Sequence, residues 1–415
     1  MSNRTQRASS NRTDPPRVAL LIETSNAYGR GLLAGVAEYV QLHGPWSIYL
    51  PETHRADDTA AARLRSWHGD GVLVRAETRN IARAVVACGA AVVDLSAAGL
   101  LAEAPAVHSD VRAEAALGFE HLWERGFRHL GFCGVSDYPW VRWQQERFYE
   151  LAARAGSTVT SFVEPLRLNQ ARGWSADRRS LAKWLSQLPK PVGIFACYDL
   201  RGQQVLDACR LAGLRIPDEV AVIGVDDDAV RCNLSDPPLS SVAPDTRRIG
   251  YQAAELLDRL MKGGRVKPGI RLIEPSGVSA RRSTDAVALA DTDIAAGLRF
   301  IRDHCCEPIT VDSVLDVVPM SRRSFESRFV RLVGCTPHAE ILRCRIEHAK
   351  RLLAETDLPI KTIAVKVGAA TPEYLSVLFQ RTVGLTPSAY RSRSSFTLPP
   401  VGAVMRTPRS VVRAV

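Results

Sequence analysis

The chain has 415 residues, which is too long for one ordinary domain and predicts two or three. Its apolar content of 46% is enough for several cores, and no apolar run reaches the ~18 residues of a membrane helix. The nine cysteines show no CxxC spacing and no Cys/His cluster, which is typical of reduced thiols in a cytoplasm. We therefore expect a cytoplasmic protein with no disulfide, no metal site and no cofactor, and with no membrane partner.

The basic charge is concentrated in the last quarter of the chain. Residues 320–415 hold 16 Lys and Arg against 6 Asp and Glu, and this surplus equals the net charge of +10 of the whole chain. Residues 1–319 are therefore neutral overall. A local basic excess is expected of a surface that neutralises nucleic-acid phosphates. A solvated basic tail is the alternative, and it accounts for the arginines beyond residue 390.

In chain order, residues 1–16 form a polar leader that we expect to be disordered, and residues 17–283 alternate apolar strands with amphipathic helices. Such alternation predicts parallel sheets covered by helices, and this length favours two lobes. The predicted strands are Val18–Ile22, Trp46–Leu50, Gly71–Val74, Ala91–Leu95, Leu130–Cys133, Val192–Ala196 and Val220–Val225. The predicted helices are Leu32–Leu42, Glu114–Arg125, Trp140–Ala155, Ala176–Leu188, Gly202–Ala212 and Arg247–Met261.

Polar residues follow several of these strands. Ligands of open parallel sheets bind beyond the carboxyl ends of the strands, so these loops should meet at one edge. Carboxylates and an arginine can hydrogen-bond adjacent sugar hydroxyls, and an aromatic ring can cover the apolar face of a sugar, so a cleft for a small sugar is predicted. The alternative for each strand-end Asp or Asn is an N-cap of the next helix. The candidate effector-binding residues are Asn26, Tyr28, Asp94, Trp143, Arg147, Asp199 and Asp226.

After a linker at 284–292, residues 293–393 are predicted to form an all-α domain in which one motif occurs twice. The order F-x4-G-x-T-P at Phe329–Pro337 returns 50 residues later at Phe379–Pro387. In each copy an apolar helix, a short break and a second helix precede the glycine, as in a helix-turn-helix, whose second helix fits the DNA major groove. The first copy places its second helix at Arg322–Leu332 after Ser321, and the second starts at Thr371-Pro372. Residues 394–415 are expected to be a disordered tail.

The two second helices are predicted to contact double-stranded operator DNA. Phe325, Phe329, Leu375 and Phe379 mark their inner faces, so the opposite faces should meet base edges and phosphates. The candidate DNA-binding residues are Arg322, Arg323, Glu326, Ser327, Arg331, Lys361, Glu373, Tyr374, Ser376 and Arg381.

The stretch from MSRRSFESRF to GLTPSAYR resembles the AraC/XylS-type DNA-binding domain, and the resemblance covers roughly residues 288–393. The segments HSDVRAEAALGFEHLWERGFRHLGFCG and PVGIFACYDLRGQQVLDACRLAGLRIPDEVAVIGVDDDAV resemble the effector domain of LacI/GalR-type regulators, which resembles periplasmic sugar-binding proteins. By that resemblance Asn26, Asp94, Arg147 and Asp226 fall on positions that hydrogen-bond the sugar.

The order of the two domains resembles the XylR type of xylose operon regulators. That resemblance implies a homodimer, D-xylose as effector, activation of xylose catabolism genes and contact with RNA polymerase. A repressor responding to another pentose or hexose is the alternative. An enzyme is a less favoured reading, because no G-x-G-x-x-G or P-loop follows a predicted strand. A cysteine methyl acceptor at Cys335 or Cys344 is less favoured still, because neither thiol has an activating partner in the sequence pattern.

Overall fold

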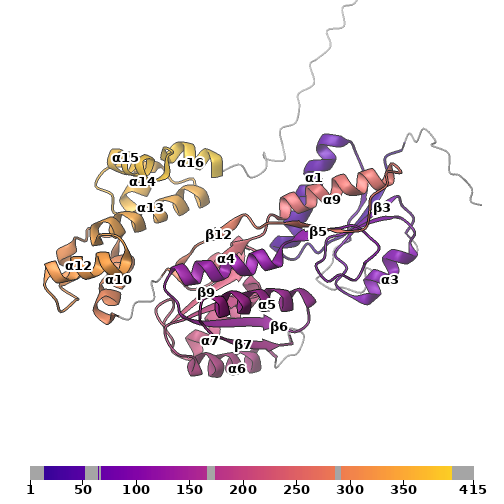
Figure 1. The fold of residues 1–415 in the computed structure, drawn as a ribbon. Helices are drawn as coiled ribbons and strands as arrows, with labels where there is room; N and C mark the ends of the chain where they lie inside the picture. Colours follow the sequence, from indigo (N-terminus) through magenta and orange to yellow (C-terminus); the bar gives the residue numbers. More distant parts are fainter. Residues whose placement is uncertain (1–13, 52–63, 65–66, 166–172, 286–290, 395–415) are drawn as a thin grey trace, which may run out of the picture. The chain divides into compact units, whose positions relative to one another are not determined.

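The computed structural model describes residues 14–51, 64, 67–165, 173–285 and 291–394. The chain divides into two compact units, Met1–Ala288 and Leu289–Val415 (Figure 1). Most of the predicted leader, linker and tail lies outside the described residues. The boundary between the units falls inside the predicted linker, and each unit is described by itself below.

The first unit contains two lobes, each built on a six-stranded sheet. In the first lobe all neighbouring strands pair in parallel. Their spatial order is β11 (Ile270–Ile273), β5 (Ala106–Ser109), β4 (Ala91–Asp94), β3 (Gly71–Val74), β1 (Arg17–Leu21) and β2 (Ser47–Tyr49). The helices of this lobe are α1 (Ala27–His43), α3 (Arg79–Ala87) and α9 (Thr246–Met261). Helices α1 and α9 pack side by side over one face (Figure 1), and α3 covers the other.

The second lobe repeats the arrangement, with one antiparallel strand at its edge. Its order is β12 (Gly277–Ser279), β10 (Ser240–Ala243), β9 (Val220–Val225), β8 (Val192–Ala196), β6 (His129–Val135) and β7 (Val159–Glu164), and only β12 runs antiparallel. The helices are α4 (Val111–Glu124), α5 (Pro139–Arg154), α6 (Gly173–Gln187), α7 (Asp199–Leu211) and α8 (Ala229–Leu234), and a 3-10 turn follows at Arg282–Thr284. The predicted two-lobed α/β class with parallel sheets is confirmed.

The chain passes between the lobes three times: between β5 and α4, between β10 and α9, and between β11 and β12. The strands β5, β7, β10, β11 and β12 were not predicted. Their sequences mix polar with apolar residues, as in the buried Ser240-Ser241 of β10 and the buried His108-Ser109 of β5, so they lack the continuous apolar run of a central strand.

The second unit is helical, as predicted. Its helices are α10 (Thr292–His304), α11 (Val311–Leu315), α12 (Arg322–Val333), α13 (Pro337–Glu355), α14 (Ile360–Lys366), α15 (Pro372–Val383) and α16 (Pro387–Ser394). The paired helices α11–α12 and α14–α15 are the two predicted helix-turn-helix motifs. Phe325 and Phe329 of α12, and Leu375 and Phe379 of α15, are fully buried, which places the inner faces where the sequence indicated.

The repeated F-x4-G-x-T-P motif is a compact connection between helices. Gly334 and Gly384 end α12 and α15 at φ of 85° and 79°, in the left-handed conformation that glycine adopts most readily. Two residues later, the hydroxyls of Thr336 and Thr386 accept the backbone N–H groups of Ala339 and Ala389, each at 3.2 Å. A proline then occupies the first turn, where no N–H is needed.

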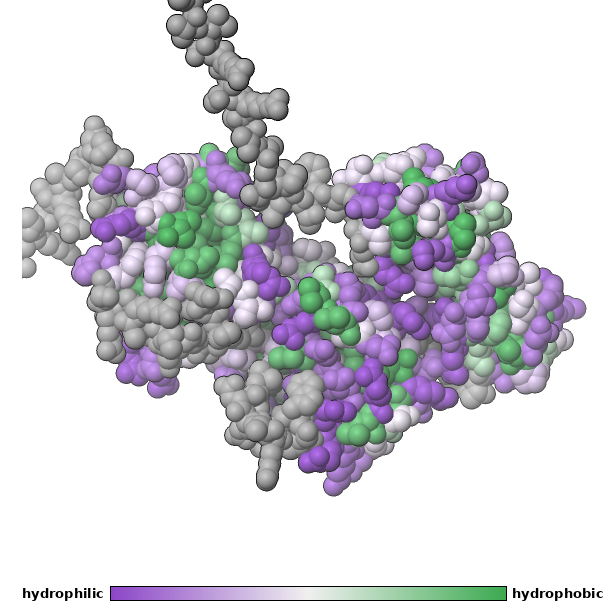
Figure 2. Space-filling model, turned by 180° about the vertical axis from the view of Figure 1, so that it is seen from behind, coloured by the Kyte–Doolittle hydropathy of each residue, from purple (hydrophilic) through white to green (hydrophobic). Residues whose placement is uncertain are grey.

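The surface seen from behind is largely hydrophilic, with apolar residues in separate patches (Figure 2). Among the described residues, no helix is both long and apolar enough to cross a membrane.

Candidate ligand pocket and nucleic-acid interface

A cavity lies between the two lobes of the first unit. It encloses about 380 Å³ of empty space when the open solvent at its mouth is included. The first lobe and the first crossing contribute Tyr28, Arg75, Leu95, Ala97, Ser109 and Val111 to the lining. The second lobe contributes Glu114, Trp140, Gln144, Cys197, Val225 and Asp226. A few polar groups in a mainly apolar wall are typical of a site that orients a small polar ligand.

The first-lobe wall is built on Arg75, which directly follows β3. Its guanidinium contacts the Glu23 carboxylate and pairs with Glu77 at 2.8 Å. The same guanidinium lies 4.7 Å from the centre of the Tyr28 ring, in the geometry of a cation–π contact. Burial raises the pKa of Tyr28 far above its usual range, so its hydroxyl stays protonated and can donate. Arg75 and Tyr28 therefore present fixed donors to the cavity.

The second-lobe wall centres on Glu114, a buried residue of the first turns of α4. Its carboxylate accepts the Ser109 hydroxyl across the crossing and the Gln144 amide at 3.1 Å. Burial raises the pKa of Glu114 to about 8, and the nearby charge of Asp226 adds to the rise. The carboxyl is therefore largely protonated at neutral pH, and it can donate a hydrogen bond as well as accept one.

The raised pKa of Glu114 predicts that the stability of the protein depends on pH. Between its usual pKa of 4.5 and about 8, Glu114 holds a proton in the folded protein that it loses on unfolding. The free energy of unfolding should therefore fall as pH rises through that window, by up to about 1.4 kcal/mol per pH unit. Chemical denaturation from pH 5 to 8 measures the slope. Glu114→Gln should reduce it, whereas Glu120→Gln, at an exposed position of the same helix, should not. Equal slopes in all three proteins would contradict the assignment.

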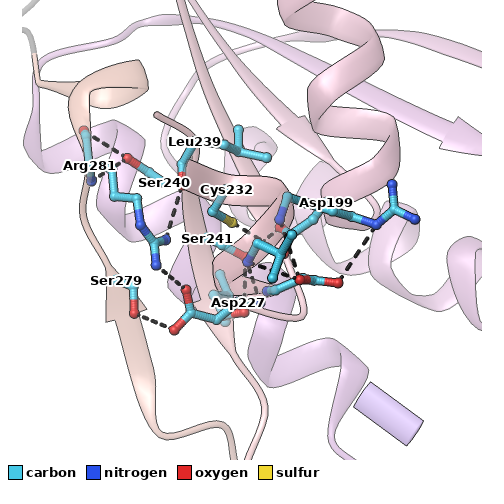
Figure 3. Close-up of polar contacts among 12 residues, drawn as sticks. Asp199, Asp227, Cys232, Leu239, Ser240, Ser241, Ser279 and Arg281 are labelled. Carbon is cyan, nitrogen blue, oxygen red and sulfur yellow. Dashed lines mark hydrogen bonds and ion pairs between the residues drawn. The ribbon is translucent and has the colours of Figure 1, made fainter. Parts of the chain in front are cut away.

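Asp226 lies in a strained loop after β9. Its φ is 110° and that of Asp227 is 47°, conformations that non-glycine residues rarely adopt. Hydrogen bonds hold this loop (Figure 3): the Asp227 carboxylate pairs with Arg281 at 2.7 Å and accepts the Ser279 hydroxyl at 2.7 Å. The backbone N–H of Asp226 donates to Val242 at 3.1 Å. The network thus holds Asp226 at the cavity.

Asp199 holds the same loop by hydrogen bonds and is not part of the cavity lining. Its carboxylate accepts the Ser241 hydroxyl at 2.6 Å and the backbone N–H of Asp228 at 2.7 Å (Figure 3). Burial raises the pKa of Asp199 well above its usual range. Asp199 therefore affects the cavity indirectly, because its hydrogen bonds fix the positions of Ser241 and Asp228.

The other predicted effector residues are also placed away from the lining. Asn26 caps α1 by accepting the Gly29 N–H at 2.7 Å, which is the alternative role stated for it. Asp94 is buried and accepts backbone N–H groups of Ala76 and Ser96, and burial raises its pKa to about 7.

On α5, Trp143 packs against the second-lobe core instead of entering the cavity. Arg147 pairs with Glu150 at 3.0 Å, in a cluster that also holds Arg112 and Arg154. Of the predicted set, Tyr28 and Asp226 line the cavity.

The residues that the sequence reasoning missed are Arg75, Ser109, Glu114, Trp140 and Gln144. Arg75 could have been identified from the sequence, because it directly follows a predicted strand, as Asp226 does. Ser109 was missed because it is the last residue of β5, a strand that was not predicted. The aromatic wall is Trp140, which stacks on Tyr138 with ring centres 5.5 Å apart.

In the second unit, α12 and α15 are the candidate reading helices, the second helices of the two helix-turn-helix motifs. The faces that were predicted to contact DNA point away from the helical core. Arg323, Ser327 and Arg331 of α12 are exposed, and Glu326 is half-buried. On the second motif Glu373, Tyr374 and Arg381 of α15 and Lys361 of α14 are exposed, and Ser376 donates its hydroxyl to the Pro372 carbonyl at 2.9 Å.

The arginines of α12 differ in how far they are already engaged. Arg322 pairs with Asp312 and with Glu326, both at 3.0 Å, and Arg328 is held by Asp291, the N-cap of α10. Arg323 makes no ion pair with a described residue, so its guanidinium is available to a phosphate or a base edge.

Three family models match this chain: an XylR N-terminal domain at residues 17–107, a periplasmic binding protein-like domain at 119–284, and a helix-turn-helix domain at 315–393. A two-lobed domain with an interlobe cavity, joined to two helix-turn-helix motifs, defines a sugar-binding type of transcription regulator.

The curated relatives identify the particular family. The xylose operon regulatory protein of Escherichia coli K12 is 34% identical over 91% of this chain and 97% of its own length. That of Haemophilus influenzae is 29% identical over 90% of this chain and 98% of its own. A solved xylose-binding transcription activator, XylR, is similar with 32% identity and a TM-score of 0.71 over 92% of this chain and 99% of its own. The chain belongs to the family of xylose operon regulatory proteins.

Proposed function

We propose that this protein is a cytoplasmic, homodimeric activator of xylose catabolism genes. D-xylose binds in the interlobe cavity, the helix-turn-helix pairs bind operator DNA, and the bound protein contacts RNA polymerase. The observation that carries the proposal is the cavity, in which Arg75, Glu114, Gln144 and Asp226 from both lobes surround one small space beside Trp140. We propose no catalytic role for this protein.

The polar lining is matched to a pentose. Arg75 and Tyr28 offer donors from the first lobe, and Asp226 offers acceptors from the second. Glu114 and Gln144 can each donate and accept, which suits neighbouring hydroxyls that do both. The Trp140 ring can cover the apolar face of the sugar. A sugar that bonds both walls stabilises the arrangement in which the lobes are close, and a ligand shifts a conformational equilibrium only through such a differential affinity.

Activation is favoured over repression because the solved relative is described as an activator. Sugar-dependent closure changes how the two subunits of the dimer place their DNA-binding units. We therefore expect xylose to increase transcription from the cognate promoter, and loss of transcription on adding xylose would favour the repressor.

A thermal-shift panel of free pentoses and hexoses tests the effector. D-xylose at ~100 times its dissociation constant should add roughly 2.7 kcal/mol to the stability of the domain that binds it. Hexoses carry an additional hydroxymethyl group that the closed site would have to accommodate, so we expect a smaller rise. A larger rise with another pentose would transfer the proposal to that sugar, and no rise with any would contradict sugar binding.

A further inference from the structure

Two adjacent cysteines and a histidine meet inside the DNA-binding unit. Cys305 and Cys306 follow the end of α10, and His348 lies 42 residues later on α13. The Cys306 Sγ lies 2.9 Å from the His348 Nδ1 and 4.0 Å from the Cys305 Sγ. The three side-chain atoms all lie within 4.8 Å of one another. Cys305 is buried, whereas Cys306 and His348 are half-buried, so the cluster is accessible from solvent.

The backbone around the cluster is fixed from two sides. Arg345 of α13 donates to the carbonyls of Cys305 at 2.6 Å and Glu307 at 2.8 Å, which caps the end of α10. Gly368, in the turn of the second helix-turn-helix, packs so closely that an added Cβ would lie 2.5 Å from the Cys306 carbonyl oxygen. The cluster therefore joins α10, α13 and the turn between α14 and α15.

A disulfide between the two thiols does not suit this geometry. The Cα atoms of neighbouring residues are about 3.8 Å apart, below the ~4.4–6.8 Å that an unstrained disulfide spans. A shared metal ion does suit it, because two metal–sulfur bonds of about 2.3 Å at an angle near 120° hold the sulfurs about 4.0 Å apart. In a tetrahedral site the Sγ–Nδ1 distance is about 3.5 Å, so the imidazole would move outward from its present distance of 2.9 Å to the Cys306 Sγ.

We propose that Cys305, Cys306 and His348 bind one thiophilic divalent cation of the Zn²⁺ class, with the remaining coordination position left to water. Thiolate and imidazole ligands select such ions over Mg²⁺ or Ca²⁺, which prefer oxygen. The bound ion ties the end of α10 to α13 and stabilises the DNA-binding unit.

Cobalt titration of the full-length, reduced, metal-free protein tests the site. Co²⁺ should produce thiolate-to-metal charge-transfer and visible d–d absorption that saturate at one ion per chain, and Zn²⁺ should abolish both. Cys306→Ser should lower the intensity of the charge-transfer band and weaken binding at least tenfold. His348→Gln should weaken binding at least tenfold and change the d–d absorption. Cys335→Ser is the matched control, since Cys335 is a half-buried thiol of the same unit outside the cluster, and it should bind as the parent does.

The melting temperature and operator affinity of each metal-free variant check that it is folded. Zn²⁺ should raise the melting transition of the parent and of Cys335→Ser, and should not raise that of Cys306→Ser or His348→Gln. An unchanged cobalt spectrum in folded Cys306→Ser and His348→Gln would overturn the proposal. So would the absence of any charge-transfer band in the parent protein.

Discussion

Asp226→Asn is expected to lower the affinity for D-xylose tenfold to a few hundredfold and to leave sugar-free DNA binding nearly unchanged. The carboxylate lines the cavity at the end of β9, and loss of a charged partner leaves buried sugar hydroxyls without an acceptor, at about 1–3 kcal/mol or more. Asn suits this test because, like Asp, it tolerates a positive φ. Calorimetric titration with xylose measures the change.

A structural role for Asp226 makes a different prediction. If its charge held the lobe together, Asp226→Asn would lower the melting temperature of the sugar-free protein. The charge of Asp226 instead adds to the rise in the pKa values of Glu114 and Asp199, which means that it disfavours the charged forms of these two carboxyl groups. We therefore expect the sugar-free variant to be no less stable than the parent. Asp236→Asn, at an exposed position of the same lobe, is the control. Xylose binding of unchanged strength in Asp226→Asn would remove this residue from the site.

Arg323→Ala is expected to weaken operator binding by about 1–3 kcal/mol and to relax the preference at one base position. Its guanidinium is exposed on the outer face of α12 and is in no ion pair with a described residue. Selection of binding sites from a randomised DNA pool measures the base preference, and a gel-shift titration measures the affinity. An unchanged base preference would contradict the assignment of Arg323 to a base edge.

Two variants serve as comparisons for Arg323→Ala. Arg331→Ala should weaken binding to all sequences alike and reduce the salt slope by about one unit, as loss of a phosphate contact does. Arg322→Ala should have a smaller effect than Arg323→Ala, because Arg322 is already paired with Asp312 and Glu326. A larger loss in Arg322→Ala would mean that DNA binding breaks those ion pairs.

The helical unit could be predicted from the sequence by itself because its determinants are local. The glycine that ends each reading helix, the threonine that caps the next and the proline that follows it stand within four residues of one another, at 334–337 and again at 384–387. Each acts through the backbone of its immediate neighbours, so the signal does not depend on the rest of the fold. The long central strands were likewise evident, because strands buried on both faces are continuous apolar runs.

Which residues line the cavity was decided by the tertiary structure. On α5, Trp140 and Gln144 lie one helical turn apart on one face, and Trp143 and Arg147 lie one turn apart on an adjacent face. Periodicity identifies both faces equally, and only the packing of α5 on its lobe decides that Trp140 and Gln144 meet the cavity while Arg147 meets Glu150.

The same limit applies to contacts between distant parts of the chain. Glu114 becomes part of the site because the chain crosses between the lobes beside Ser109, and its pKa is raised by burial that the sequence does not record. His348 lies 42 residues after the adjacent Cys305 and Cys306, a spacing unlike any short metal-binding motif. The three residues meet only because α10 ends against α13.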